Sequence, residues 1–117
     1  MKILFCDDEL PLRRIVSMIL DAHGHHVEVA CDGQEALEKI QANAFDVLIT
    51  DNAMTPLTGI ELVEKLRAVN NPIKVIMASA FKNQLDAAVQ DRLHLDGILI
   101  KPYDGKELFD CLKNIGC

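Results

Sequence analysis

The sequence is poor in aromatic residues and in basic ones. It has no tryptophan, one tyrosine and four phenylalanines, and its 12 lysines and arginines are outnumbered by 18 aspartates and glutamates, which leaves a net charge of −6. Surfaces that bind nucleic acids need clustered lysine and arginine, and surfaces that bind single strands also need exposed aromatic platforms. We therefore predict no direct nucleic-acid binding by this domain.

Long apolar runs and paired cysteine motifs are missing as well. No apolar run approaches the roughly 18 residues needed to cross a membrane, and residues 1–6 lead directly into acidic residues without the apolar segment of a secretory signal. We expect no membrane association and a cytoplasmic location. No two of the four cysteines form a C-x-x-C motif, so free thiols are expected rather than a disulfide or a zinc site. The cysteines are Cys6, Cys31, Cys111 and Cys117.

The apolar residues that are present follow two patterns along the chain. They make up 50% of the 117 residues, enough for one domain with a buried core, which we assign to residues 1–117. Short continuous or alternating runs predict strands at 3–6, 26–30, 47–49, 75–78 and 98–100. Spacings of three and four residues predict helices at 11–22, 34–42, 59–69, 83–93 and 105–115.

Strands that alternate with helices predict an α/β fold, in which a parallel five-stranded sheet lies between two layers of helices. Segment 26–30 alternates between polar and apolar residues, as edge strands do, whereas the other four segments suit buried positions. The strand order 2-1-3-4-5 satisfies this pattern and defines a flavodoxin-like (βα)5 three-layer sandwich. Asp32, Thr58 and Asp104 each precede a glutamate by three residues, which resembles the capping box of a helix start.

Polar residues follow the ends of four predicted strands. Asp7 and Asp8 follow the first strand, Asp51 the third, Ser79 the fourth and Lys101 the fifth. The carboxyl ends of parallel strands lie along one edge of a sheet, and open α/β sheets bind ligands where the strand order reverses, here between the first and third strands. We therefore expect these five side chains to converge.

Carboxylates that meet in one crevice repel each other, and a divalent cation removes that conflict. Mg²⁺ prefers oxygen ligands and often shares its shell with a phosphate. A lysine supplies a positive charge to a phosphoryl oxygen, and a hydroxyl supplies a hydrogen bond. Asp51, Lys101 and Ser79 are thus predicted to form a phosphoryl-transfer site, with Asp51 as the nucleophile.

In these motifs the whole chain resembles the receiver domain of two-component response regulators. The ordered set of matches is the acidic pair Asp7-Asp8, then Asp51, Gly59 eight residues later, Ser79-Ala80 and Lys101-Pro102. The resemblance implies that Asp51 is the phosphoacceptor and that Asp8, Asp51 and the main-chain carbonyl of Ala53 bind Mg²⁺. It further implies that Asp7 orients water on the metal, that Ser79 bonds the phosphoryl group and that Lys101 pairs with it.

The resemblance also implies partners. The phosphoryl donor would be a phosphohistidine on a sensor histidine kinase or a histidine phosphotransfer protein. Phosphorylation would change the face formed by segments 83–93, 98–100 and 105–115, which would signal to an effector protein or to a C-terminal output domain. The resemblance allows a homodimer through this face. We expect a switch rather than an enzyme, with only self-catalysed phosphotransfer and autodephosphorylation.

The chain departs from the family pattern at two positions. The family usually has proline four residues after the phosphoacceptor, where this chain has Thr55, with Pro56 following. The family often has an aromatic residue three positions before the lysine, where this chain has Ile98, so a rotating aromatic side chain is not expected. We expect the Lys101–Pro102 peptide bond to be cis.

Three other functions compete with this interpretation. A haloacid-dehalogenase-type phosphatase also uses a nucleophilic aspartate with Mg²⁺, but it needs a second acid two residues later, where this chain has Ala53. A flavodoxin-like electron carrier needs a phosphate-binding loop after the first strand, where Asp7, Asp8 and Glu9 would repel phosphate. A receiver-like interaction module without phosphorylation is argued against by the complete set of site residues.

Overall fold

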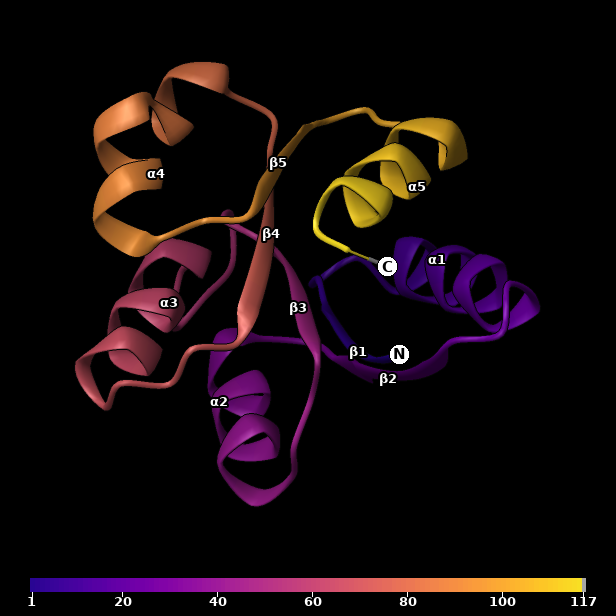
Figure 1. The fold of residues 1–117 in the computed structure, drawn as a ribbon, viewed down its shortest axis with the longest axis horizontal. Coiled ribbons are helices and arrows are strands. Elements are labelled where there is room, and N and C mark those ends of the chain that lie inside the picture. Colours follow the sequence, from indigo (N-terminus) through magenta and orange to yellow (C-terminus); the bar gives the residue numbers. More distant parts are fainter. Residues whose placement is uncertain (117) are drawn as a thin grey trace.

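The computed structural model describes residues 1–116 and has a five-stranded parallel sheet with helices on both faces (Figure 1). The strand order is β2-β1-β3-β4-β5, which confirms the predicted fold and places the alternating second strand at an edge. The strands are β1 (Lys2–Cys6), β2 (His26–Ala30), β3 (Val47–Asp51), β4 (Lys74–Ser79) and β5 (Gly97–Ile100). All four pairings between neighbouring strands are parallel.

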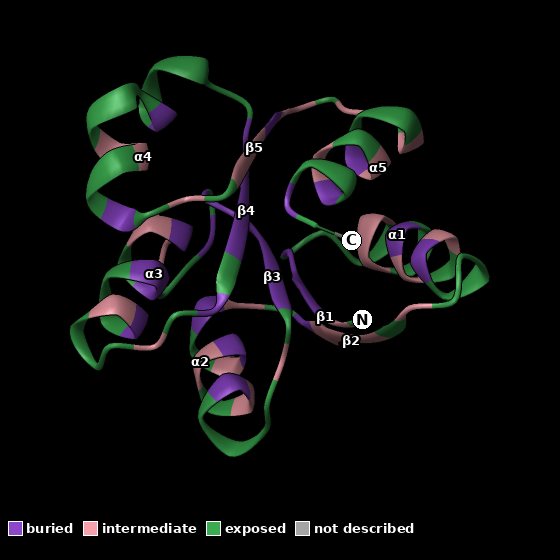
Figure 2. Cartoon of the chain, in the orientation of Figure 1, coloured by how far each residue is buried: buried purple, intermediate pink, exposed green. Residues whose placement is uncertain are grey.

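Two apolar cores lie on opposite faces of the sheet, because successive side chains of a strand point to opposite sides. In β1, Ile3 and Phe5 belong to one core, while Leu4 and Cys6 belong to the other. Helices α1 (Leu10–Ala22) and α5 (Gly105–Asn114) cover the first face. Helices α2 (Gly33–Ala42), α3 (Gly59–Ala68) and α4 (Ala87–Leu93) cover the second, so that the central strands are buried on both sides (Figure 2).

The helix starts follow the capping signals in the sequence, with one exception. Thr58 and Asp104 form complete capping boxes with the glutamates three residues later. Asp32 accepts the Glu35 main-chain N–H as predicted, but the Glu35 carboxylate accepts from the main-chain N–H of Cys31 at 2.6 Å. The start of α2 is therefore capped from one side only.

The helix predicted over 83–93 is divided in the structure. A 3₁₀ turn, η1 (Lys82–Leu85), is followed by α4, which begins only at Ala87. Asp86 separates them because its backbone is extended and its side chain accepts the Val89 main-chain N–H as the N-cap of α4. The prediction of one continuous helix was wrong because an aspartate at this position caps a new helix instead of continuing the first.

Cys6 is buried, Cys111 half-buried and Cys31 exposed, and all three are free thiols; Cys117 lies outside the described residues. The Lys101–Pro102 peptide bond is cis, as expected, and a second cis bond joins Thr55 to Pro56. Within residues 1–116, no helix has the length and apolar character that crossing a bilayer would require.

The start of α3 lies close to the end of β3 because residue 59 is a glycine. A Cβ atom at Gly59 would lie 2.5 Å from the carbonyl oxygen of Asp51 and 2.9 Å from Cα of Asn52. A side chain at this position would therefore push against backbone rather than against a flexible group. Gly105 occupies the same first position of α5, after a capping box of the same kind, and a Cβ there would meet nothing within 4 Å.

We predict that Gly59→Ala lowers the free energy of unfolding by about 1–3 kcal/mol, because it overpacks the end of β3. Gly105→Ala is the matched control and should leave stability within about 1 kcal/mol of the original, with a tendency to increase it. Urea denaturation followed by far-UV circular dichroism measures both. Equal effects of the two substitutions would contradict the close contact at Gly59.

Candidate functional site

Three acidic residues meet at the carboxyl edge of the sheet, as the strand order predicts. Asp7 and Asp8 follow β1, and Asp51 ends β3; a carboxylate oxygen from each lies within 4.8 Å of those from the other two. Asp7 and Asp51 are 1% and 4% exposed, whereas Asp8 is exposed. Two buried carboxylates and one exposed carboxylate thus lie together at this edge of the sheet.

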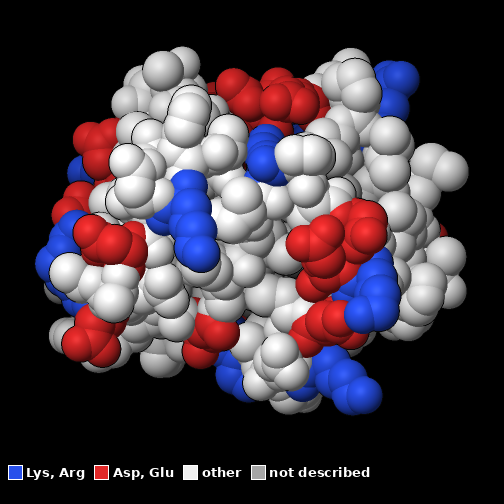
Figure 3. Space-filling view, turned by 90° about the horizontal axis from the view of Figure 1, so that it is seen from above, with Lys and Arg blue, Asp and Glu red and all other residues white. Residues whose placement is uncertain are grey.

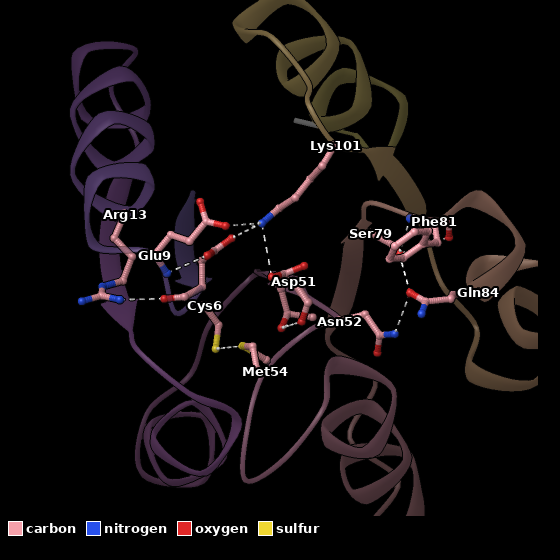
Figure 4. A network of polar contacts seen from close by, with 12 residues as sticks. Cys6, Glu9, Arg13, Asp51, Asn52, Met54, Ser79, Phe81, Gln84 and Lys101 are labelled. Atoms are coloured by element: carbon pink, nitrogen blue, oxygen red, sulfur yellow. Dashed lines mark hydrogen bonds and ion pairs between the residues drawn. The ribbon is translucent and has the colours of Figure 1, made fainter.

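Lys101 crosses this edge of the sheet to reach the acids. Its Nζ lies 3.0 Å from Oδ2 of Asp7, 3.2 Å from Oδ2 of Asp51 and 3.8 Å from Oε1 of Glu9 (Figure 4). Burial favours the neutral amine, but the ion pairs with Asp7 and Asp51 outweigh it, so the pKa of Lys101 is raised above its ordinary value. The lysine is therefore held positively charged between the two buried carboxylates.

The Asp51 carboxylate is the least satisfied group of the cluster. Burial raises its pKa above the ordinary value; the charge of Lys101 opposes this, and the charge of Asp7 adds to it. Its Oδ1 atom is buried and has no hydrogen-bond partner within the described residues. A buried carboxylate oxygen without a protein donor is satisfied by water or by a cation, and beside Asp7 and Asp8 it fits an oxygen-ligated divalent metal.

Main-chain contacts hold the first acid in place. Asp7 donates its main-chain N–H to the carbonyl of Ala30 on β2 at 3.1 Å, and its Oδ1 accepts the main-chain N–H of Glu9 at 2.9 Å. The Arg13 guanidinium, one turn into α1, donates to the Asp7 carbonyl at 2.8 Å. The role of Arg13 was not predicted, because nothing in a helical pattern shows that a side chain turns back to the preceding loop.

Asn52, directly after Asp51, fixes the other side of the site and was also missed by the sequence prediction. Its main-chain N–H donates to the Ala78 carbonyl on β4 at 2.9 Å. Its side-chain Oδ1 accepts the Ile60 main-chain N–H at 3.0 Å, and its Nδ2 donates to Gln84 Oε1 at 3.4 Å. One residue therefore ties β3 to β4, α3 and η1.

Ser79 lies at the end of β4 as predicted, but within residues 1–116 its hydroxyl makes no hydrogen bond with the acids. The Oγ atom donates to Gln84 Oε1 at 2.7 Å, and the Phe81 carbonyl lies 3.1 Å away. The same Oγ accepts the Phe81 main-chain N–H at 3.0 Å. Figure 4 shows Ser79 linked to Gln84, while the acids are linked to Lys101. The structure thus brings Lys101 and the acids together and leaves Ser79 engaged with η1.

Ala53 and Ile98, which the sequence analysis also singled out, lie outside this network of side-chain contacts. Ala53 is exposed in the loop two residues after Asp51, and its main-chain carbonyl as a metal ligand stays a prediction. Ile98, in β5, is half-buried and packs against the core on the face covered by α2, α3 and α4.

On the face of the molecule in Figure 3, acidic and basic side chains are interspersed and no continuous basic area is present.

Comparison with known proteins identifies the class to which this fold and site belong. Residues 3–113 match the family model of the response regulator receiver domain. Because the match covers nearly the whole chain, the protein belongs to this family and is a receiver domain of the two-component type. The family match gives no support to the phosphatase or to the electron carrier.

Individual relatives agree with the family. The chain is 33% identical over 114 residues to the transcriptional regulatory protein CpxR homolog of Haemophilus influenzae, a match that covers 97% of this chain and 49% of the relative. It is 35% identical over 107 residues to the probable transcriptional regulator ycf27 of Cyanophora paradoxa, with 92% and 44% covered. The chain thus spans about half the length of the curated relatives it matches.

Solved structures share the fold over almost their full length. The chemotaxis response regulator CheY4 of Vibrio cholerae matches with a TM-score of 0.88 and 32% identity, covering 97% of both chains. The response regulator TrrA from Thermotoga maritima, in complex with Mg²⁺–BeF, matches with a TM-score of 0.87 and 25% identity, again over 97% of both. The fold is therefore that of chemotaxis-type response regulators.

The raised pKa of Asp51 leads to a prediction about stability and pH. Because the pKa is higher in the folded than in the unfolded chain, ionised Asp51 destabilises the fold above the folded-state pKa, and this penalty disappears as pH falls below the unfolded-state pKa. Asp51→Asn should therefore raise the melting temperature at neutral pH in the presence of a chelator, by about 2–5 °C. The difference should shrink on acidification.

The same variant tests the metal site. Millimolar Mg²⁺ should raise the melting temperature of the original chain, because a ligand that binds the folded state stabilises it, and should leave Asp51→Asn almost unchanged. Asp21→Asn, at an exposed position on α1, serves as the control and should respond like the original. An equal Mg²⁺ response in Asp51→Asn would remove Asp51 from the metal ligands.

Proposed function

We propose that this domain is a phosphoacceptor switch in which Asp51 receives a phosphoryl group with the help of Mg²⁺ and Lys101. The observation that carries the proposal is the unpartnered, buried Oδ1 of Asp51, next to Asp7, Asp8 and the Lys101 ammonium. A carboxylate in this setting is a nucleophile whose surroundings are already arranged to neutralise added negative charge.

In the proposed reaction, an oxygen of Asp51 attacks the phosphorus of a phosphohistidine. The O–P bond forms as the P–N bond breaks, and the leaving imidazole nitrogen takes a proton from water. Lys101 exchanges its contact with the Asp51 carboxylate for a phosphoryl oxygen, and Ser79 donates its hydroxyl proton to another. Positioning and charge neutralisation account for the transfer, so the domain is a switch that catalyses only its own phosphorylation and dephosphorylation.

The acidic cluster is the proposed site for Mg²⁺. Asp8, Asp51 and the carbonyl of Ala53 would hold Mg²⁺, and Asp7 would act through water on the ion. When bound, Mg²⁺ would neutralise the carboxylates and the phosphoryl oxygens. Support comes from the oxygen-only composition of the cluster and from TrrA, a structural neighbour that was solved in complex with Mg²⁺–BeF.

The class of protein indicates two kinds of partner. A sensor histidine kinase or a histidine phosphotransfer protein would supply the phosphoryl group. The signal would pass through the face formed by α4, β5 and α5 to an effector protein or to an output domain. Curated relatives named as transcriptional regulators are about twice as long as the matched region, which supports an output domain in proteins of this type. We place the domain in the cytoplasm, with residues 1–117 forming one receiver unit.

Phosphorylation can be measured directly. Incubation with acetyl phosphate or phosphoramidate and Mg²⁺ should add the mass of one phosphate to the intact protein, and base should remove it, because an acyl phosphate is labile to hydroxide. Asp51→Asn should show no mass gain, and Asp21→Asn should be labelled normally. A chain that stays unlabelled would instead be the non-phosphorylated interaction module, and full labelling of Asp51→Asn would remove Asp51 as the acceptor.

The role of Lys101 is tested by separating phosphorylation from response. Lys101→Ala should fold and lose most of the conformational response to phosphorylation, because the ammonium is the group that changes partner when charge is added. Two-dimensional NMR spectra with and without acetyl phosphate measure that response at α4, β5 and α5. Lys65→Ala, at an exposed position on α3, is the control, and a response in Lys101→Ala equal to that of the control would contradict the assignment.

A further inference from the structure

The hydrogen bonds of Ser79 identify a residue that the proposed chemistry does not use. Gln84 belongs to η1 and is exposed, yet its Oε1 atom lies 2.7 Å from the buried Ser79 hydroxyl. The same Oε1 accepts from Asn52 Nδ2 at 3.4 Å. A single carbonyl oxygen on an exposed side chain therefore joins the residue after Asp51 to the hydroxyl at the end of β4 (Figure 4).

The Ser79 hydroxyl has only one proton to donate. Two acceptors compete for it, and the distance to Gln84 Oε1 is 2.7 Å, compared with 3.1 Å to the Phe81 carbonyl. The shorter distance, close to the ideal for an O–H donor, commits the proton to Gln84. In this arrangement the hydroxyl cannot donate toward Asp51, whose Oδ1 atom stays without a partner.

We infer that Gln84 is a positioning residue that holds the Ser79 hydroxyl in its unphosphorylated orientation and releases it when Asp51 is phosphorylated. The inference rests on the proposed function of Asp51. A hydrogen bond to a charged phosphoryl oxygen is roughly twice as strong as one between neutral groups. The Ser79 hydroxyl therefore turns from Gln84 Oε1 and donates to the added phosphoryl group instead. Gln84 then keeps only its longer contact with Asn52.

This exchange links the site to the surface. When Ser79 turns away, η1 loses the shorter of the two side-chain hydrogen bonds that tie Gln84 to the ends of β3 and β4. The exposed side chains of η1, Lys82 and Asn83 among them, then belong to a turn with weaker attachment to the sheet. Gln84 thus connects phosphorylation of Asp51 to the attachment of η1, the turn before α4.

Beryllofluoride with Mg²⁺, a stand-in for the phosphoryl group, gives a direct test by isothermal titration. Gln84→Leu removes the acceptor and keeps the size of the side chain, so it should bind beryllofluoride about 2- to 10-fold more tightly, the factor that a lost neutral hydrogen bond corresponds to. Asn83→Leu makes the same amide-to-leucine change on the neighbouring residue and should bind like the original.

A double-mutant cycle shows whether Gln84 acts through Ser79. In a Ser79→Ala background, Gln84→Leu should change the affinity by less than about 2-fold, because the held group is absent. The same gain in both backgrounds would overturn the inference, since a general loosening of η1 does not depend on Ser79.

A measurement on the free protein tests the contact itself. The Asn52 side-chain amide resonances should shift in Gln84→Leu and stay in place in Asn83→Leu, and unchanged resonances in both variants would contradict the bond. If the original chain shows no saturable binding of beryllofluoride, the proposed function is wrong and the inference falls with it. If the original chain binds and Gln84→Leu binds no more tightly, only the role of Gln84 is wrong.

Discussion

The site depends on one lysine that compensates two buried carboxylates. Asp7 and Asp51 are both buried, and a buried charge without a partner is costly, so the two carboxylates need a cation beside them. Lys101 stands after β5, and β4 separates β5 from β3 in the sheet, so the long side chain reaches across the end of β4 to the acids. The ion pairs of Lys101 therefore also join the end of β5 to the ends of β1 and β3, two strands that form no hydrogen bonds with β5.

The second constraint is the tight loop after β3. Gly59 allows the start of α3 to touch the Asp51 peptide, and Asn52 uses its main-chain and side-chain groups to bond β4, α3 and η1. Asp51, the proposed nucleophile, is thus held by its own backbone neighbours and does not rely on side-chain packing alone. Such fixed geometry suits the proposed phosphoryl transfer, in which catalysis comes mainly from positioning and charge stabilisation.

The sequence predicted the sheet and the meeting of the acids well, because both follow from topology. Apolar strands and one alternating strand determine the order 2-1-3-4-5, and parallel strands bring Asp7, Asp8 and Asp51 to one edge whatever the details of the loops. The orientation of Ser79 could not be predicted in this way, since it depends on where Gln84 points. Within a predicted helix, Gln84 was only one polar residue among several.

Helix starts were predictable where the sequence carries a complete capping box and not where a single aspartate is the cap. The capping boxes at Thr58 and Asp104 formed as expected, because each glutamate lies three residues after the cap residue, within reach of its main-chain N–H. Asp86 gave no such signal, and its role as a cap became clear only from the extended backbone before α4. One consequence follows for movement in this segment. Because Asp86 caps α4 independently, the turn η1 can change its conformation without unwinding the first turn of α4.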